Sequence, residues 1–171
     1  MRVRRSLLFV SAFLFWGCAT SPTPVPSADP ATARTTGQGP VVGYRAENGA
    51  QVWLGLPFAQ PPVGELRWKA PRPPEGWSDP RAALSFGPEC IQFAGPMGSD
   101  AEAGSVAGSE DCLYLNVFAP ARAAADAEPP GEGLPVMFWI HGGGNSIGSA
   151  HVYDASALAV QEQVLVVTCL L

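Results

Sequence analysis

Histidine is scarce in this sequence: its 171 residues contain two, His141 and His151. The four cysteines include no closely spaced pair. Zinc and related metal sites are built from clustered cysteine and histidine side chains. We therefore expect no metal site, and we expect no cofactor.

Basic residues are also few, and they form no patch along the chain. Ten lysine and arginine residues stand against fifteen aspartate and glutamate residues, which gives a formal net charge of −5. Because proteins bind nucleic acid largely through clustered lysine and arginine, we expect no nucleic-acid partner. Long apolar runs are missing too, since the run Leu7–Trp16 is far too short to span a bilayer.

The N-terminus has the proportions of a secretory signal. Arg2, Arg4 and Arg5 precede the apolar run, a pattern typical of an exported protein whose leader is removed. We assign residues 1–17 to this signal peptide. Its removal takes away three arginines and no acidic residue, so the formal charge becomes −8.

The leader ends at Gly17-Cys18, which resembles a bacterial lipoprotein signal, where cleavage leaves a lipid-modified cysteine at the new N-terminus. Residues 18–40 are rich in Ser, Thr, Pro and Gly, a composition typical of a flexible tether. We expect a protein of the bacterial cell envelope that touches the membrane only through lipid on Cys18. The alternative is a secreted protein whose leader is cut near Ala19. The folded domain is expected over residues 41–171.

Two short apolar runs open this domain. Val41–Arg45 and Gln51–Leu56 flank an Asn48-Gly49 pair, and Asn-Gly is a strong hairpin-turn signal. We therefore expect an antiparallel hairpin. The proline-rich segment that follows, as far as Pro80, excludes helix and central strand.

Several large apolar side chains in and beside the proline-rich segment are expected to hold it against the core by burial. They are Leu56, Phe58, Leu66, Trp68 and Trp77. We assign no chemistry to them. Arg67 lies among them, and the sequence leaves open whether it forms a buried ion pair or lies in solvent.

Cys90 and Cys112 bracket a loop of small, glycine-rich and acidic residues. In an exported chain, two such cysteines are first interpreted as a disulfide, and two unpaired thiols are the alternative. Closing a loop of about 22 residues stabilises a fold by about 3.4 kcal/mol on the chain-entropy formula.

The second half of the chain predicts an α/β arrangement. Glu110–Pro120 begins with two acids and becomes a strand that its final proline ends. Val136–Ile140 is an apolar run with the length of a strand buried on both faces, and Val164–Thr168 is a second one.

A short helix is expected between these two apolar strands. Asp154 is placed to cap a helix over Ala155–Glu162, which Leu158 would anchor to the core. A strand, a helix and a strand in this order predict a right-handed crossover and a parallel sheet.

His141 and three consecutive glycines directly follow the strand predicted at Val136–Ile140. Because glycine has no Cβ, the backbone N–H groups of such a loop can turn toward one point and bind a developing negative charge, as an oxyanion hole does in acyl transfer. A flexible turn leaving a core strand is the alternative. The loop by itself does not decide between the two.

Three motifs, in the right order, resemble the type B carboxylesterase and cholinesterase-like family of α/β-hydrolases. The first lies between Gly55 and Trp68 and is similar to the family's G-I-P-Y-A…P-P-V-G…L-R-F block. The second, Glu110–Pro120, matches the family's E-D-C-L-Y-L-N-V signature. The third, His141–Gly144, is similar to its H-G-G-G loop.

The resemblance implies the N-terminal portion of an α/β-hydrolase fold, with an N-terminal β-hairpin and the first strands of the central mixed sheet, truncated before the nucleophile elbow. It also implies a carboxylic ester hydrolase that acts through a serine acyl-enzyme on a small-molecule carboxylic ester. Gly143 and Gly144 would supply two backbone N–H groups of the oxyanion hole. Cys90 and Cys112 would form the family's first disulfide, and His141 would be a structural residue of the loop instead of the catalytic base.

The sequence departs from the family pattern in two ways. Asn145 stands where relatives often carry an aromatic or other bulky residue, so the shape of the acyl pocket is open. The family's G-E-S-A-G elbow, and the acid and histidine that follow it, do not occur in these 171 residues. Ser146 fits G-x-S-x-G literally, but it does not directly follow the strand, because Gly142–Asn145 come between. His151 also precedes the acids, whereas the family order places the acid before the histidine. We therefore do not assign Ser146 as a nucleophile.

We predict an esterase portion that is inactive alone, because nucleophile, acid and base are all missing from it. Its apolar strands would lack neighbours, and the exposed edge and faces would favour aggregation or proteolysis. Two other functions stay open, a non-catalytic cholinesterase-like binding module and a structural lipoprotein. A downstream elbow serine would distinguish an enzyme from the binding module.

Overall fold

The computed structural model describes residues 25–95, 101–121 and 133–170. The signal peptide predicted over residues 1–17, and Cys18 with it, lie outside the described residues. A search of the described residues for a helix that is both long and apolar enough to cross a membrane finds none.

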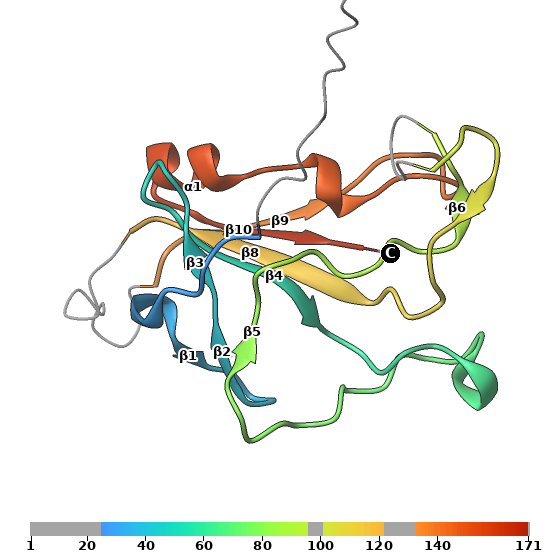
Figure 1. The fold of residues 1–171 in the computed structure, drawn as a ribbon, viewed down its shortest axis with the longest axis horizontal. Coiled ribbons are helices and arrows are strands. Elements are labelled where there is room, and N and C mark those ends of the chain that lie inside the picture. Colours follow the sequence, from blue (N-terminus) through green and yellow to red (C-terminus); the bar gives the residue numbers. More distant parts are fainter. Residues whose placement is uncertain (1–24, 96–100, 122–132, 171) are drawn as a thin grey trace, which may run out of the picture.

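A five-stranded mixed sheet forms the centre of the structure (Figure 1). Its strands follow the spatial order β3-β4-β8-β10-β9. All neighbours pair antiparallel except β10 and β9, which are parallel. The strands are β3 (Tyr44–Arg45), β4 (Gln51–Pro57), β8 (Tyr114–Ala119), β10 (Leu165–Cys169) and β9 (Val136–Ile140).

The predicted hairpin is present, but its first strand is divided. β3 pairs with β4 across the Asn48-Gly49 turn, where Ala46 N–H donates to Ala50 O at 2.9 Å. The run expected as one strand is interrupted at Gly43. Only glycine fits there, because a Cβ would overlap the carbonyl oxygen of Val52. The residues before it form β2 (Pro40–Val42), which belongs to a different sheet.

This second sheet is small and lies below the first in Figure 1. β2 pairs antiparallel with β1 (Arg34–Thr35) and parallel with β5 (Arg81–Ala82). A two-stranded hairpin, β6 (Gln92–Phe93) and β7 (Val106–Ala107), lies near the other end of the molecule.

The folded part of the chain begins earlier than its composition predicts. The flexible tether expected over residues 18–40 is wrong from about Asp29 onward, where a 3₁₀ turn at Pro30–Thr32 (η1) precedes β1. Thr32 is fully buried, and its carbonyl oxygen accepts from the indole N–H of Trp53 at 2.9 Å. A buried indole N–H needs an acceptor. Thr32 supplies it, so this hydrogen bond holds the N-terminal segment against the fold.

Side chains alternate between the two faces of the central sheet, and both faces are covered over β4, β8 and β10. On one face, Val52, Phe118 and Val166 pack against Ala159 of the helix. On the other face, Trp53 and Ala119 pack with Val41 and Ala83 of the small-sheet side. Burial on both faces explains why these strands read as apolar runs.

The helix α1 (Ser156–Glu162) connects β9 to the parallel strand β10, so the predicted strand–helix–strand unit is confirmed. The N-cap position is Ala155, one residue later than the predicted cap Asp154. Asp154 Oδ1 nevertheless accepts from the N–H of Ser156, the first helical residue, at 2.9 Å. Leu158 is not the anchor, since 38% of its surface is exposed, whereas Ala159 is fully buried. A small residue fits where α1 lies close to β8 and β10.

After the end of β4, the proline-rich segment as far as Pro80 contains one element, a 3₁₀ turn at Gly64–Leu66 (η2). Burial of Trp68 was the wrong expectation, because this side chain is 96% exposed in the structure. Trp77 is half-buried and donates its indole N–H to Pro40 O at 2.7 Å. Arg67 forms an ion pair with Glu110, and half of the Arg67 side chain is exposed. It is therefore neither a buried ion-pair partner nor an arginine that lies in solvent without a partner.

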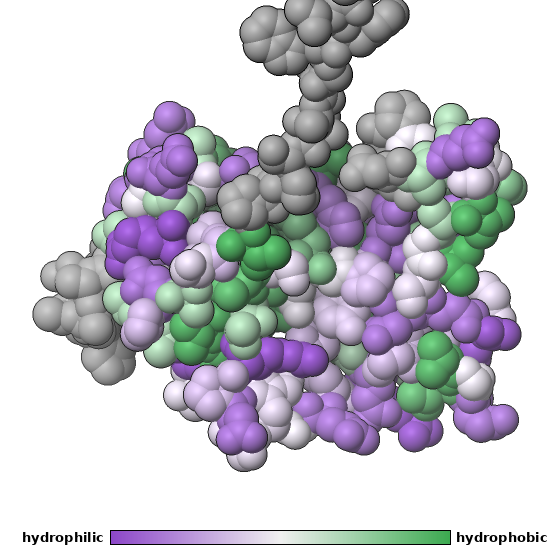
Figure 2. Space-filling model, in the orientation of Figure 1, coloured by the Kyte–Doolittle hydropathy of each residue, from purple (hydrophilic) through white to green (hydrophobic). Residues whose placement is uncertain are grey.

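β9 is the edge of the central sheet within the described residues. All five of its side chains are exposed, by 42–64%. Burial of this strand on both faces was therefore the wrong expectation, whereas the expectation that its apolar residues would lack cover is confirmed. For β10 the expected lack of cover was wrong, because β8 and β9 flank this strand and Val166, Thr168 and Cys169 are buried. Elsewhere, on the face shown in Figure 2, hydrophobic residues form separate patches among hydrophilic ones.

Two phenylalanines test this difference in cover. Phe118 is 2% exposed and Phe138 is 56% exposed. Phe118→Ala should lower the free energy of unfolding by about 3–5 kcal/mol, because it leaves a cavity in the core. Phe138→Ala should change it by less than about 0.5 kcal/mol and should reduce aggregation. Urea denaturation and light scattering measure the two effects, and equal destabilisation by both variants would contradict the assignment of the core.

Candidate functional site

The glycine loop, residues 141–148, follows β9 directly and lies beside β6 at one end of the sheet (Figure 1). Gly143 has φ +133° and Gly144 has φ +62°. A Cβ on Gly143 would overlap the carbonyl oxygen of Ile147. Only glycine fits this position, because the backbone both takes a positive φ and passes close to another carbonyl.

Hydrogen bonds inside the loop involve the carbonyl oxygen of Gly143 and leave the N–H groups of Gly143 and Gly144 free. The carbonyl oxygen of Gly143 accepts from the N–H groups of Ser146 and Ile147, both at 3.2 Å. The N–H groups of Gly143 and Gly144 have no acceptor within the part of the chain that the structure describes. Two adjacent free donors on a closed loop can bind an anionic oxygen.

Gln92 holds the C-terminal end of the glycine loop through two hydrogen bonds. Its Oε1 accepts from the N–H of Gly148 at 2.6 Å, and its Nε2 donates to the carbonyl oxygen of the same residue at 3.0 Å. Gln92 is only 8% exposed. Sequence reasoning missed this residue, and its place two positions after Cys90 is the only signal that could have drawn attention to it.

Cys90 and Cys112 form a disulfide, with their Cα atoms 5.0 Å apart. Cys112 lies just before β8, so the bond ties the segment that carries Gln92 to the central sheet. Residues 96–100, inside the closed loop, lie outside the described residues. The free cysteine Cys169 is buried, and burial raises the pKa of its thiol above the usual range.

The two histidines and Ser146 do not form a catalytic group in the structure. Ser146 Oγ lies 3.4 Å from Gly143 O and 3.3 Å from Gly144 O, within its own turn. His151 donates from Nε2 to Gly87 O at 2.7 Å and stacks on Phe86. Ser146 therefore has no histidine partner among the described residues.

His141 is held within the glycine loop. Its Nδ1 lies 2.9 Å from Gly142 O and donates to it. Its Nε2 is buried and has no hydrogen-bond partner among the described residues. This geometry supports a structural role for His141, although that assignment stays a prediction.

A cavity of about 370 Å³ opens at the glycine loop. Besides the loop itself, its lining comes from Cys90, Ile91, Gln92 and Ile140. No aspartate, glutamate, lysine or arginine is among the described residues that line it. The cavity is in the size range of small-molecule sites.

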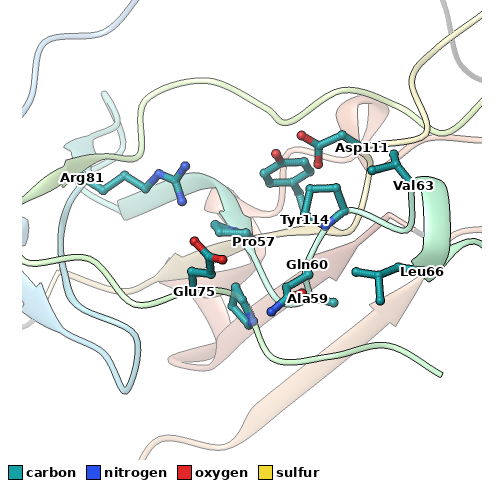
Figure 3. A pocket seen from close by; sticks show the side chains of 11 residues that line it. Pro57, Ala59, Gln60, Val63, Leu66, Glu75, Arg81, Asp111 and Tyr114 are labelled. Atoms are coloured by element: carbon teal, nitrogen blue, oxygen red, sulfur yellow. The ribbon is translucent and has the colours of Figure 1, made fainter. Parts of the chain in front are cut away.

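A second cavity, of about 480 Å³, is lined by the start of the proline-rich segment and by β8 (Figure 3). Arg81 and Glu75 lie at one side of it, and Tyr114 and Asp111 at another. Burial and, less strongly, the hydrogen bond to Asp111 raise the pKa of Tyr114, which keeps this phenol neutral. No serine, cysteine or histidine lines this cavity in the described residues, so it offers neither a serine or cysteine nucleophile nor a histidine base. The described residues also contain no group of three side chains able to hold a metal ion.

Comparison with known proteins gives a family match over residues 30–170, to the model described as the carboxylesterase family. The chain belongs to this family. The match begins at residue 30, in agreement with the early start of the fold and ahead of the boundary predicted at residue 41.

Two relatives illustrate the similarity. The chain is 47% identical over 145 residues to the medium-chain fatty acyl-CoA hydrolase precursor of Anas platyrhynchos, covering 78% of this chain and 25% of that protein. It is 46% identical over 140 residues to the para-nitrobenzyl esterase of Bacillus subtilis, covering 78% and 26%.

A solved PNB esterase structure is 45% identical to this chain over the matched region and superimposes on it with a TM-score of 0.68. The match covers 82% of this chain and 27% of that structure. The chain therefore spans about a quarter of the length of the relatives it matches, over their N-terminal portion. Its fold is a partial α/β-hydrolase-like structure built on mixed sheets.

Loss of the disulfide should weaken the fold measurably. For the 22-residue separation between Cys90 and Cys112, replacing both by serine should lower the free energy of unfolding by about 3.4 kcal/mol. Cys169→Ala, which removes a buried thiol outside the disulfide, should cost clearly less. Urea titration of the two variants measures the difference, and an unchanged midpoint in the double variant would contradict a stabilising bond.

Proposed function

We propose that residues 30–170 form the oxyanion-binding part of a carboxylic ester hydrolase that works through a serine acyl-enzyme. The two free N–H groups of Gly143 and Gly144 carry this proposal. Membership of the carboxylesterase family supports it. The nucleophilic serine, the acid and the histidine base belong to the three quarters of the relatives' length that this chain does not match.

In the proposed reaction, the serine oxygen bonds to the ester carbonyl carbon while the histidine takes its proton. The carbonyl oxygen becomes an anion, and the N–H groups of Gly143 and Gly144 donate to it. The tetrahedral intermediate then releases the alcohol, and water hydrolyses the acyl-enzyme. One oxyanion-hole donor typically contributes about 2.7–4 kcal/mol to transition-state stabilisation.

The cavity at the glycine loop favours an uncharged acyl group. Ile91, Ile140 and Ile147 line it together with polar but uncharged groups. Burying a charged acyl group there would cost free energy, because no opposite charge is present in the described lining. Asn145, which has a left-handed backbone conformation with φ +58°, also lines this cavity.

A chimera tests the role of the loop. In it, residues 30–170 replace the matching segment of the Bacillus subtilis esterase, and hydrolysis of a para-nitrobenzyl ester is measured. Gly143→Ala should lower kcat by about 10²–10³, because the new Cβ displaces an oxyanion donor. Gly142→Ala is the matched control, since a Cβ there meets no atom within 4 Å, and it should change kcat little.

Equal kcat values for the two glycine variants would contradict an oxyanion hole in this loop. The 171-residue chain, assayed alone on the same ester, should release no product above the buffer rate. Clear hydrolysis by the chain alone would contradict the division of roles between this portion and the rest of the domain.

We also propose that the protein is exported to the bacterial cell envelope and anchored by lipid on Cys18. The basic and apolar leader supports this, as does the disulfide, because disulfides persist in oxidising compartments.

Labelling with radioactive palmitate in a bacterial host tests the anchor. The wild-type chain should incorporate label and fractionate with membranes, and Cys18→Ser should do neither. Cys169→Ser is the control, because it removes a different cysteine and should keep both properties. Unlabelled wild-type protein in the culture medium would instead support secretion.

A further inference from the structure

We infer that Gln92 is the positioning residue of the oxyanion loop: its side-chain amide fixes Gly148, and through Gly148 it sets the place of the Gly143 and Gly144 N–H groups. The inference rests on the proposed function of this loop. Gln92 also lines the cavity at the glycine loop, but its amide bonds the backbone of Gly148, so the role inferred for it acts through the backbone.

The contact between Gln92 and Gly148 is a closed pair of hydrogen bonds. One planar amide satisfies both the N–H and the C=O of the same residue, at 2.6 Å and 3.0 Å, and both bonds are buried. This is the pattern that a neighbouring strand would supply to an extended residue. The loop has no strand there, so a side chain from 56 positions earlier in the chain provides the bonds.

Gly148 in turn packs against the start of the loop. It has φ +131°, and a Cβ there would overlap Nδ1 of His141 and come within 2.5 Å of Gly142 O. The two ends of the loop are therefore in backbone contact. Because Gly143 follows this contact directly, fixing Gly148 restricts the position of its N–H group.

Gln92 is itself held firmly on its own side. Its Nε2 also lies 3.3 Å from both Glu89 Oε2 and Cys90 O. Its backbone pairs with Ala107 in the β6–β7 hairpin. The Cys90–Cys112 disulfide joins this hairpin to the central sheet. The oxyanion loop is thus tied to the sheet twice, at β9 and through Gln92.

The chemistry requires a glutamine at this position. The side chain must donate and accept at the same time, and an amide does both without a charge. Methionine has a similar length, but its sulfur cannot donate and accepts only weakly. Glutamate can make both only when it is protonated, because an ionised carboxylate accepts but does not donate.

Hydrogen exchange of the 171-residue chain, followed by mass spectrometry on peptides covering residues 141–149, tests the inference. Gln92→Met should increase exchange in this segment about tenfold, the scale of one lost hydrogen bond. Peptides from β8 should exchange as in the wild type. Gln38→Met is the control, because Gln38 is exposed, and it should leave the loop unchanged.

Gln92→Glu tests the inference through pH dependence. A side chain that only filled space beside Gly148 would not make protection of the loop depend on pH. Burial, the carboxylate of Glu89 and two carbonyl oxygens, those of Cys90 and Gly148, all disfavour its ionised form. His141 is the other titratable group near Gly148. At low pH the variant should protect the loop as the wild type does, and protection should fall as pH rises through the raised pKa of the new carboxyl group. The wild type at each pH is the reference.

The inference is overturned if Gln92→Met protects residues 141–149 as well as the wild type, or if Gln92→Glu shows no pH dependence relative to it. In the chimera, Gln92→Met should lower kcat about tenfold with little change in KM, which follows from a displaced donor that acts in the transition state. Unchanged kcat together with increased exchange would also overturn it. The proposed function is judged separately, by Gly143→Ala against Gly142→Ala.

Discussion

The side-chain amide of Asn116 joins the three central strands of the sheet. Its Oδ1 accepts from the N–H of Gly55 in β4 at 3.0 Å, and its Nδ2 donates to Thr168 Oγ1 in β10 at 3.1 Å. The register between β4 and β8 shifts between Trp53 and Leu56, so the backbone ladder is interrupted there. A fully buried amide takes the place of the missing ladder bonds, and an unpaired polar group at this depth would be costly. Together with the backbone pairing of β8 and β10, this arrangement fixes β10, and β9 with its glycine loop is paired to β10 in turn.

Asn116 and Gln92 solve the same problem at two places. Each satisfies backbone groups where the regular pairing of strands fails, and each does so without introducing a charge into the interior. One lies in the middle of the sheet and the other at its end, beside the loop that carries the free N–H groups. In a carboxylesterase, where catalysis depends on donors held at fixed positions, these neutral amides give the loop its support without disturbing the local electrostatics.

Features set by local sequence were predictable from it. The Asn48-Gly49 turn, the strands around Phe118 and Val166, the helix near Asp154 and the parallel crossover all follow from short-range patterns. Features set by distant contacts were not. Trp68 was expected to be buried only because its side chain is apolar, and it is exposed. The segment near Thr32 was expected to be a tether, and its folded state depends on a hydrogen bond to the distant Trp53. The role of Gln92 was hidden for the same reason, because its partner lies 56 residues away. The glycine loop was recognised as a candidate site from its motif, whereas its means of support was not.

The contacts that shape the glycine loop have a consequence for biosynthesis. Gly55 and Asn116 are 61 positions apart, Gln92 and Gly148 are 56 apart, and the disulfide spans 22. Every one of these partners is synthesised by the time the ribosome has completed β10, the strand through which β9 joins the sheet. Because domains acquire structure from the N-terminal side as they are made, the loop can take its final shape before later parts of a carboxylesterase emerge. The order of translation would then follow the order of assembly, with the glycine loop shaped as soon as the strands beside it are made.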